Sequence, residues 1–331
     1  LQALSSSPPT TAVCFDIDGV LCRGEAALPH AQDAVDRLKA AGVPFQLVTN
    51  GGGVLEATKA AKVSKQLGTP ISPEQMIVCH TPLKSLVEEY ADRRVLVLGS
   101  SDILSVARSY GLQKAMCVED VVCDEPSRYP FFSIPHRPLS VSLEDDHIAA
   151  VWLMYDPIHW SLDLQIALDV IRGRATAGSA LGTGSHQAIP VYACNPDLVF
   201  SGEYGAPRLA AGAFTQTLEF MFHQLTGEHL VVQSYGKPLK VTFDLALDHL
   251  AAGAGVPSST FTKVFMIGDN PAADIRGAND AGPVWTSVLV ETGVYTPEPD
   301  QLNDAADPAD HVVSHVGEAI DIVLEHVAAA K

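Results

Sequence analysis

Short apolar runs alternate along this chain with stretches whose apolar residues recur at helical spacing, and this alternation limits the folds available to it. The first round has an apolar run ending at Phe15, a helical pattern from Ala31 to Ala41, and a second apolar run from Pro44 to Val48. A helix between two such runs predicts a right-handed βαβ crossover, which lays the two strands parallel in one sheet. The sequence therefore predicts an α/β fold with a doubly wound parallel sheet.

The pattern also predicts two structural units. A new series of strand and helix patterns begins at Arg94, and the first pattern resumes at Leu230. We therefore expect a core domain from residues 11–92 plus 230–331, with an inserted α/β domain at 93–229. Within the insert, we expect strands at 117–122 and 148–155.

Polar side chains follow several of the predicted strands. Asp16 and Asp18 come at the end of the first strand, and their spacing of two places both on one face of the sheet. This is the carboxyl end, where open α/β sheets bind ligands. Two adjacent like charges indicate a bound cation or a reaction that uses them. The other polar residues expected at this edge are Thr49, Asn50, Lys237, Asp269 and Asp274.

These residue types together predict phosphoryl transfer. A carboxylate can attack phosphorus and form an acyl phosphate, and Asp16 is the candidate nucleophile. Asp18 is suited to protonate the leaving oxygen and then to deprotonate a water molecule. The hydroxyl of Thr49 and the ammonium of Lys237 would hold the phosphoryl oxygens.

A magnesium ion would complete such a site, because Mg²⁺ prefers a shell of carboxylates, other oxygens and water. We expect Asp16, the backbone carbonyl of Asp18, and Asp269 to be ligands. Asp274 would be a further ligand or would orient the others.

Four short motifs resemble the signature motifs of the haloacid dehalogenase (HAD) superfamily. They are FDIDGV at 15–20, VTN at 48–50, GKP at 236–238 and GDNPAADIRGAN at 268–279. The long insert is similar to the C2-type cap of the class IIA branch. Within that branch, VTNGGG and CNPDLVFSGEYGAPRLAAGAF look most like the cat eye syndrome critical region protein 5 subgroup.

This resemblance implies a Rossmann-like core with an inserted C2-type cap. It also implies that Asp16 is the nucleophile, Asp18 the acid and base, Lys237 the phosphate-binding lysine and Asp269 a magnesium ligand. Asn50 would bind substrate phosphate with Thr49. The glycine-rich continuation TNGGG departs from many class IIA phosphatases and changes the floor of the site.

The expected function is that of a Mg²⁺-dependent phosphatase, which hydrolyses a small phosphomonoester through an aspartyl-phosphate intermediate. The partner would be a small phosphorylated metabolite, which the motifs do not identify. Two alternatives stay open: a binding or scaffold protein of low activity, and a phosphotransferase with a lipid-related role. The resemblance also suggests a homodimer formed through the cap.

Composition limits the classes of partner that the protein could bind and the cellular compartments in which it could lie. A net charge of −18 argues against nucleic-acid binding, and no run approaches the ~20 apolar residues of a membrane span. The six cysteines are scattered, which is typical of reduced thiols inside the cell. The subgroup has mitochondrial fungal members, so we expect a mitochondrial location by resemblance and a cytoplasmic one otherwise. Because position 1 is a leucine, we expect that a removed segment or an artificial boundary precedes it, and a targeting peptide could be missing.

Overall fold

The computed structural model describes residues 8–100, 102–131, 147–173, 186–200, 204, 206–297 and 303–330. Its first unit is built on a sheet of six parallel strands. In spatial order these strands are β15 (His311–Val313), β14 (Trp285–Val290), β13 (Lys263–Gly268), β1 (Thr11–Phe15), β4 (Phe45–Val48) and β5 (Met76–Ile77).

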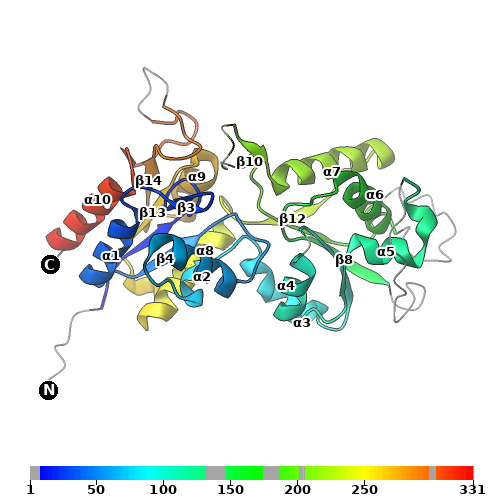
Figure 1. Cartoon of the computed structure of the whole chain (residues 1–331), viewed down its shortest axis with the longest axis horizontal. Coiled ribbons are helices and arrows are strands. Elements are labelled where there is room, and N and C mark those ends of the chain that lie inside the picture. The colour runs from blue at the N-terminus through cyan, green and yellow to red at the C-terminus, as the bar shows by residue number, and fades with distance from the viewer. Residues whose placement is uncertain are drawn as a thin grey trace.

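Helices cover both faces of this sheet (Figure 1). Side chains alternate along β1, so Val13 and Phe15 face one apolar cluster while Ala12 and Cys14 face another. The first cluster is closed by α1 (Ala31–Ala41), α2 (Glu56–Leu67) and α10 (Val316–Ala329). The second is closed by α8 (Lys240–Ala254) and α9 (Arg276–Ala281). The predicted doubly wound α/β fold is confirmed.

A second sheet of five parallel strands forms the other half of the elongated molecule (Figure 1). Its order is β12 (Val232–Tyr235), β9 (Val191–Cys194), β8 (Ile148–Leu153), β6 (Arg94–Leu98) and β7 (Ala115–Met116). One face packs against α5 (Val118–Asp124), α6 (Trp160–Ile171) and α7 (Ala211–Thr226), and the other against α3 (Val87–Tyr90) and α4 (Ile103–Tyr110).

Short elements complete the chain. Two-stranded antiparallel pairs join β2 (Cys22–Arg23) to β3 (Ala26–Ala27) and β10 (Val199–Phe200) to β11 (Arg208–Leu209). Short 3₁₀ helices occur at η1 (Pro73–Gln75), η2 (Thr81–Leu86), η3 (Pro126–Arg128) and η4 (Ser258–Thr260), and a π-helical turn forms η5 (Pro271–Ile275).

Two sequence expectations were wrong. The strand predicted at 117–122 is helix α5, in which Val118, Val121 and Val122 are buried at helical spacing. The chain from Leu230 onward was assigned to the core, but its first strand, β12, pairs with β9 and extends the second sheet. A short strand pattern does not specify which sheet the strand joins. The domain boundaries at 93 and 229 therefore stay a proposal. With these boundaries, β12 is counted in the core domain although it belongs to the second sheet.

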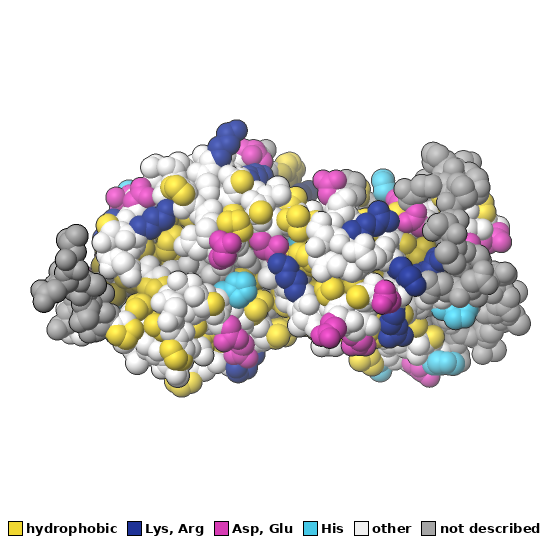
Figure 2. Space-filling model, turned by 90° about the horizontal axis from the view of Figure 1, so that it is seen from below, with side chains coloured by type: hydrophobic (Ala, Val, Ile, Leu, Met, Phe, Trp, Pro, Cys, Tyr) yellow, Lys and Arg dark blue, Asp and Glu magenta, His cyan; other side chains and the backbone are white. Residues whose placement is uncertain are grey.

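The surface in Figure 2 carries acidic and basic side chains interspersed over one face, with no gathering of Lys and Arg. None of the helices in the described part of the chain is long and apolar enough to cross a membrane.

Candidate active site

Three carboxylates converge at the carboxyl ends of two neighbouring strands. Asp16 follows β1, Asp269 follows β13, and Asp274 lies in the turn η5 that comes next. Because β1 and β13 are adjacent and parallel, their ends meet at the same edge of the sheet. One oxygen of each carboxylate lies within 4.8 Å of the others, and all three residues are buried. This acidic cluster contains three of the four residues predicted to hold a metal.

Lys237 supplies the positive charge of the cluster. Its buried Nζ donates a hydrogen bond of 2.6 Å to Asp274 Oδ1 and lies 2.9 Å from Asp16 Oδ1. Burial alone would lower the pKa of Lys237, but the charges of Asp16 and Asp274 raise it above its ordinary value. Lys237 is therefore a fixed cation at the floor of the site.

The cluster fits a small divalent cation bound by oxygen atoms. Three carboxylates face one ammonium, and burial raises the pKa of both Asp269 and Asp274 above the ordinary range. The contact of Asp16 Oδ1 with Lys237 lacks hydrogen-bond geometry, so this buried oxygen has no hydrogen-bond partner among the described residues. Carboxylate oxygens of this kind are the ligands that Mg²⁺ prefers.

Two glycines leave room for the Asp269 carboxylate. A Cβ atom at Gly19 or at Gly293 would overlap this carboxylate, and Gly19 also has a φ of +90°, which disfavours other residues. The backbone N–H of Val294 donates to Asp269 Oδ2 at 2.6 Å. The loop after β14 therefore holds Asp269 in place, although the sequence analysis did not include it in the site. Its signal is a glycine three residues after the end of an apolar strand, within residues 291–294.

Asp18 lies beside the cluster and outside it. Its side chain is 41% exposed, and its Oδ2 is 3.8 Å from Nζ of Lys59. Loss of solvent raises the pKa of Asp18 above its ordinary value, against the opposing charge of Lys59, and Asp16 adds to the rise. The carboxylate is thus separate from the three that converge, and a raised pKa suits a group that must carry a proton.

Thr49 and Asn50 follow β4 and lie at the same edge. The hydroxyl of Thr49 accepts a hydrogen bond of 2.9 Å from the N–H of Gly51. The Asn50 amide contacts the backbone of Lys237 twice: Oδ1 accepts from its N–H at 2.8 Å and Nδ2 donates to its carbonyl at 2.9 Å. Nδ2 also donates to Asp197 Oδ2 at 2.9 Å. These contacts make Asn50 a positioning residue for Lys237, and its predicted contact with phosphate stays a prediction.

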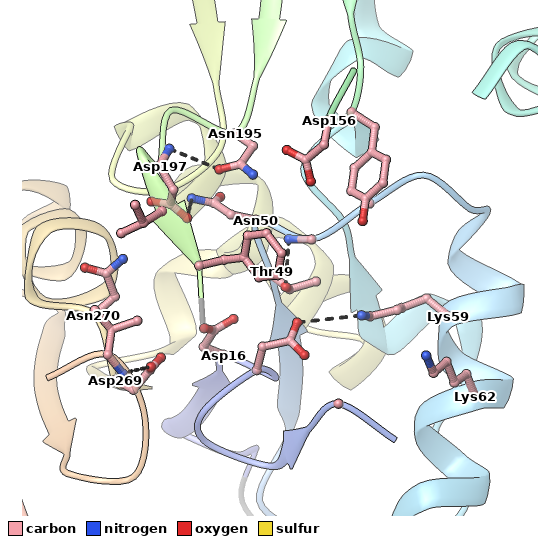
Figure 3. Close-up of a pocket in the computed structure, with 18 of the residues that line it drawn as sticks. Asp16, Thr49, Asn50, Lys59, Lys62, Asp156, Asn195, Asp197, Asp269 and Asn270 are labelled. Carbon is pink, nitrogen blue, oxygen red and sulfur yellow. Dashed lines mark hydrogen bonds and ion pairs between the residues drawn. The ribbon is translucent and has the colours of Figure 1, made fainter. Parts of the chain in front are cut away.

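A cavity of about 260 Å³ opens above these residues, between the two units (Figure 3). Asp16, Asp18, Thr49, Asn50 and Asp269 lie on its core side. The second unit closes it with Tyr155, Asp156, Asn195, Asp197 and Phe200. Burial raises the pKa of Asp197 to about 6, with Asn50 acting in the opposite direction.

Comparison with known proteins gives the family. Models of a haloacid dehalogenase-like hydrolase and of an HAD-hydrolase-like domain match residues 13–113 and 234–319. The chain is 34% identical to the mitochondrial hydrolase of Saccharomyces cerevisiae over 345 residues, which cover 96% of each protein. The chain belongs to the haloacid dehalogenase-like hydrolase family.

Two further proteins resemble this hydrolase. A fusion protein of Schizosaccharomyces pombe, named cardiolipin synthase (CMP-forming) / mitochondrial hydrolase, is 34% identical over 342 residues. That match covers 99% of this chain and 56% of the fusion protein. The glycerol phosphate phosphatase of Mycobacterium tuberculosis in complex with magnesium has the same fold, with a TM-score of 0.64 and 18% identity. It aligns with 95% of this chain and 76% of its own.

Several residues of this hydrolase that line the cavity were missed by the sequence analysis. Lys59 and Lys62 lie on α2, and no motif distinguishes them from other lysines of an amphipathic helix. Tyr155 and Asp156 reach the cavity from the segment that follows β8. The position of Asp156 at a strand end is a signal of the kind that identified Asp16.

Proposed function

We propose that this hydrolase is a Mg²⁺-dependent phosphatase that cleaves a small phosphomonoester through a phosphorylated Asp16. The observation that carries the proposal is the convergence of Asp16, Lys237, Asp269 and Asp274. Asp16 and Asp269 line the cavity with Asp18 beside them, and Lys237 and Asp274 are buried behind them. A nucleophile, a proton carrier and a fixed cation are therefore within one site.

The proposed reaction has two displacements at phosphorus. In the first, a carboxylate oxygen of Asp16 bonds to phosphorus, the bond to the alcohol oxygen breaks, and Asp18 gives that oxygen a proton. In the second, Asp18 takes a proton from a water molecule while the water oxygen bonds to phosphorus, and the bond between phosphorus and Asp16 breaks. The products are the alcohol and inorganic phosphate, and both carboxyl groups return to their starting states.

The remaining residues hold the charged group. Lys237 and the hydroxyl of Thr49 would contact phosphoryl oxygens, and Asn50 would keep Lys237 in position through its backbone. The carboxylates of Asp16, Asp269 and Asp274, with the backbone carbonyl of Asp18, would hold Mg²⁺. When bound, the ion supplies positive charge for the phosphoryl oxygens. The magnesium complex of the structurally similar phosphatase supports magnesium as the ion.

The comparisons support two further proposals, and the arrangement of the two units suggests a third. The name of the yeast relative supports a mitochondrial location. The fusion to a cardiolipin synthase in another yeast supports a lipid-related phosphate ester or acceptor as a second candidate role. The second unit would act as a cap that excludes water during transfer, and a homodimer through this cap is part of the proposal.

The test is phosphate release from a panel of phosphomonoesters in the presence of Mg²⁺. The panel should contain sugar, glycerol, nucleoside and lipid-precursor phosphates. Asp16→Asn keeps the shape of the side chain and removes the nucleophile, so turnover should fall by at least about 10⁴-fold. If no substrate is hydrolysed faster by the wild type than by this variant, the enzyme is not a phosphatase for these classes and a binding role is favoured.

A further inference from the structure

Helix α2 gives the cavity one basic wall. Lys59 and Lys62 are three residues apart, so they share a face of the helix, and both line the cavity (Figure 3). They are the only Lys or Arg side chains among the described cavity-lining residues. In a chain of net charge −18, two lysines on one wall of an otherwise acidic cavity mark the side on which an anion would be accepted.

The ammonium of Lys59 has one distant ion pair and donates no hydrogen bond to any described residue. Its side chain is 16% exposed, and its nearest carboxylate oxygen, on Asp18, is 3.8 Å away and beyond hydrogen-bond distance. No acceptor among the described residues takes a hydrogen bond from it. Lys62 differs, because it is 48% exposed and donates to Glu25 Oε1 at 2.8 Å. Three unused donors on a partly desolvated cation are suited to an anionic ligand.

The place of Lys59 relative to Asp18 indicates which part of a substrate it would meet. Asp16, Asp18 and Lys59 all line the cavity. The carboxylate that Lys59 approaches is that of Asp18, with Oδ2 3.8 Å from its Nζ, and not that of Asp16. In the proposed reaction, Asp18 protonates the leaving oxygen. The organic part of the substrate then extends from Asp18 toward the α2 wall.

We propose that Lys59 binds a second anionic group, a carboxylate or another phosphate, on the alcohol part of the substrate. The inference rests on the proposed function, which fixes the direction of the leaving group. It narrows the substrate class to phosphomonoesters with two separated anionic groups. The competing account is that Lys59 only offsets the charge of Asp18, and this would affect every substrate equally.

The experiment compares substrates that differ in the second anionic group. One pair is 3-phosphoglycerate and glycerol 3-phosphate, which tests a carboxylate. The other is the bisphosphate and the monophosphate of 1,3-propanediol, which tests a second phosphate. 4-Nitrophenyl phosphate serves as the substrate without such a group. The variants are Lys59→Met and, as the matched control, Lys65→Met, which removes an exposed lysine of the same helix.

In at least one pair, we expect the wild type to have the higher kcat/KM for the substrate that carries the second anionic group. Lys59→Met should reduce that preference by about tenfold, the effect of losing one charge-assisted hydrogen bond, and change 4-nitrophenyl phosphate by no more than about threefold. Lys65→Met should match the wild type. An equal loss for all substrates, or a wild type with no preference in either pair, would overturn the proposal.

A binding measurement separates failure of this inference from failure of the proposed function. Calorimetric titration of the same pairs into the Asp16→Asn protein, with and without Lys59→Met, does not require turnover. Selective binding that depends on Lys59 would support the anion site even in a protein that hydrolyses nothing. Equal affinity for both members of each pair would overturn it.

Discussion

At the scale of single residues, the floor of the site has an imbalance of charge. One buried ammonium, Lys237, faces the buried carboxylates of Asp16, Asp269 and Asp274. Buried charges without full compensation destabilise a fold, and anything that binds the folded state and neutralises them stabilises it. The cluster therefore links metal binding to stability.

We predict that Mg²⁺ raises the free energy of unfolding, by about 2.7 kcal/mol at a concentration one hundred times its Kd. Asp269→Asn should weaken this response, because it removes one carboxylate of the cluster. Asp248→Asn, at an exposed position on α8, is the matched control and should respond as the wild type does. Chemical denaturation with and without Mg²⁺ measures the effect, and an unchanged response in Asp269→Asn would exclude this cluster as the site.

At the scale of elements, a buried polar network joins α2, η2 and α4. Glu56 Oε1 accepts hydrogen bonds from Thr81 at 2.8 Å and from Tyr110 at 2.7 Å, and it pairs with Lys84 at 2.8 Å. Tyr110 uses its only proton for Glu56, so His80 Nδ1, at 2.8 Å, must donate to the Tyr110 oxygen. Burial lowers the pKa of His80 from 6.5 to about 4, against the opposing charge of Glu56.

This shift predicts a pH dependence of stability. Between pH 6.5 and about 4, the unfolded chain binds a proton at His80 and the folded chain does not. The free energy of unfolding therefore falls as the pH is lowered through this range. Above pH 7 His80 has no such effect. The full loss is about 3 kcal/mol.

The measurement is the difference in unfolding free energy between the wild type and His80→Asn at about pH 7.5 and about pH 4.5. On going to the lower pH, the wild type should lose more unfolding free energy than His80→Asn does. His311→Asn, at an exposed histidine, controls for general effects of pH. A difference that is constant over this range would contradict the assignment.

Some of these elements could be predicted from the sequence alone and others could not. The carboxyl ends of β1, β4 and β13 could be predicted, because an apolar run followed directly by Asp16, Thr49 or Asp269 is a local pattern. Helix α5 could not, because Val121 and Val122 fit a strand as well as a buried helix. The place of Lys59 in the site could not be predicted either, since it depends on which face of α2 lies against the cavity.

At the scale of the whole molecule, the site is shared between two units. Tyr155, Asp156 and Asp197 reach the cavity only because the second unit lies over the first, and no local pattern specifies that approach. One direct link between the units, at the cavity itself, is the hydrogen bond from Asn50 to Asp197. It connects the residue that positions Lys237 to the roof of the cavity.

A double-mutant cycle tests this link. Asn50→Ala and Asp197→Ala should each lower the unfolding free energy, and the double variant should lose less than the sum, with a coupling of about 0.5–3 kcal/mol. The physical reason is that each single change already removes the shared hydrogen bond. Thermal or chemical denaturation of the four proteins gives the coupling, and simple additivity would show that the units are not joined through this pair.

The central claim is that Asp16 becomes phosphorylated. A rapid acid quench during turnover of a hydrolysed phosphomonoester, followed by peptide mass spectrometry, tests it most directly. The account predicts one phosphoryl group on the peptide that contains Asp16, lost on mild alkaline treatment, and absent from Asp16→Asn. Continued turnover with no phosphorylated peptide, or a phosphoryl group on another residue, would contradict it.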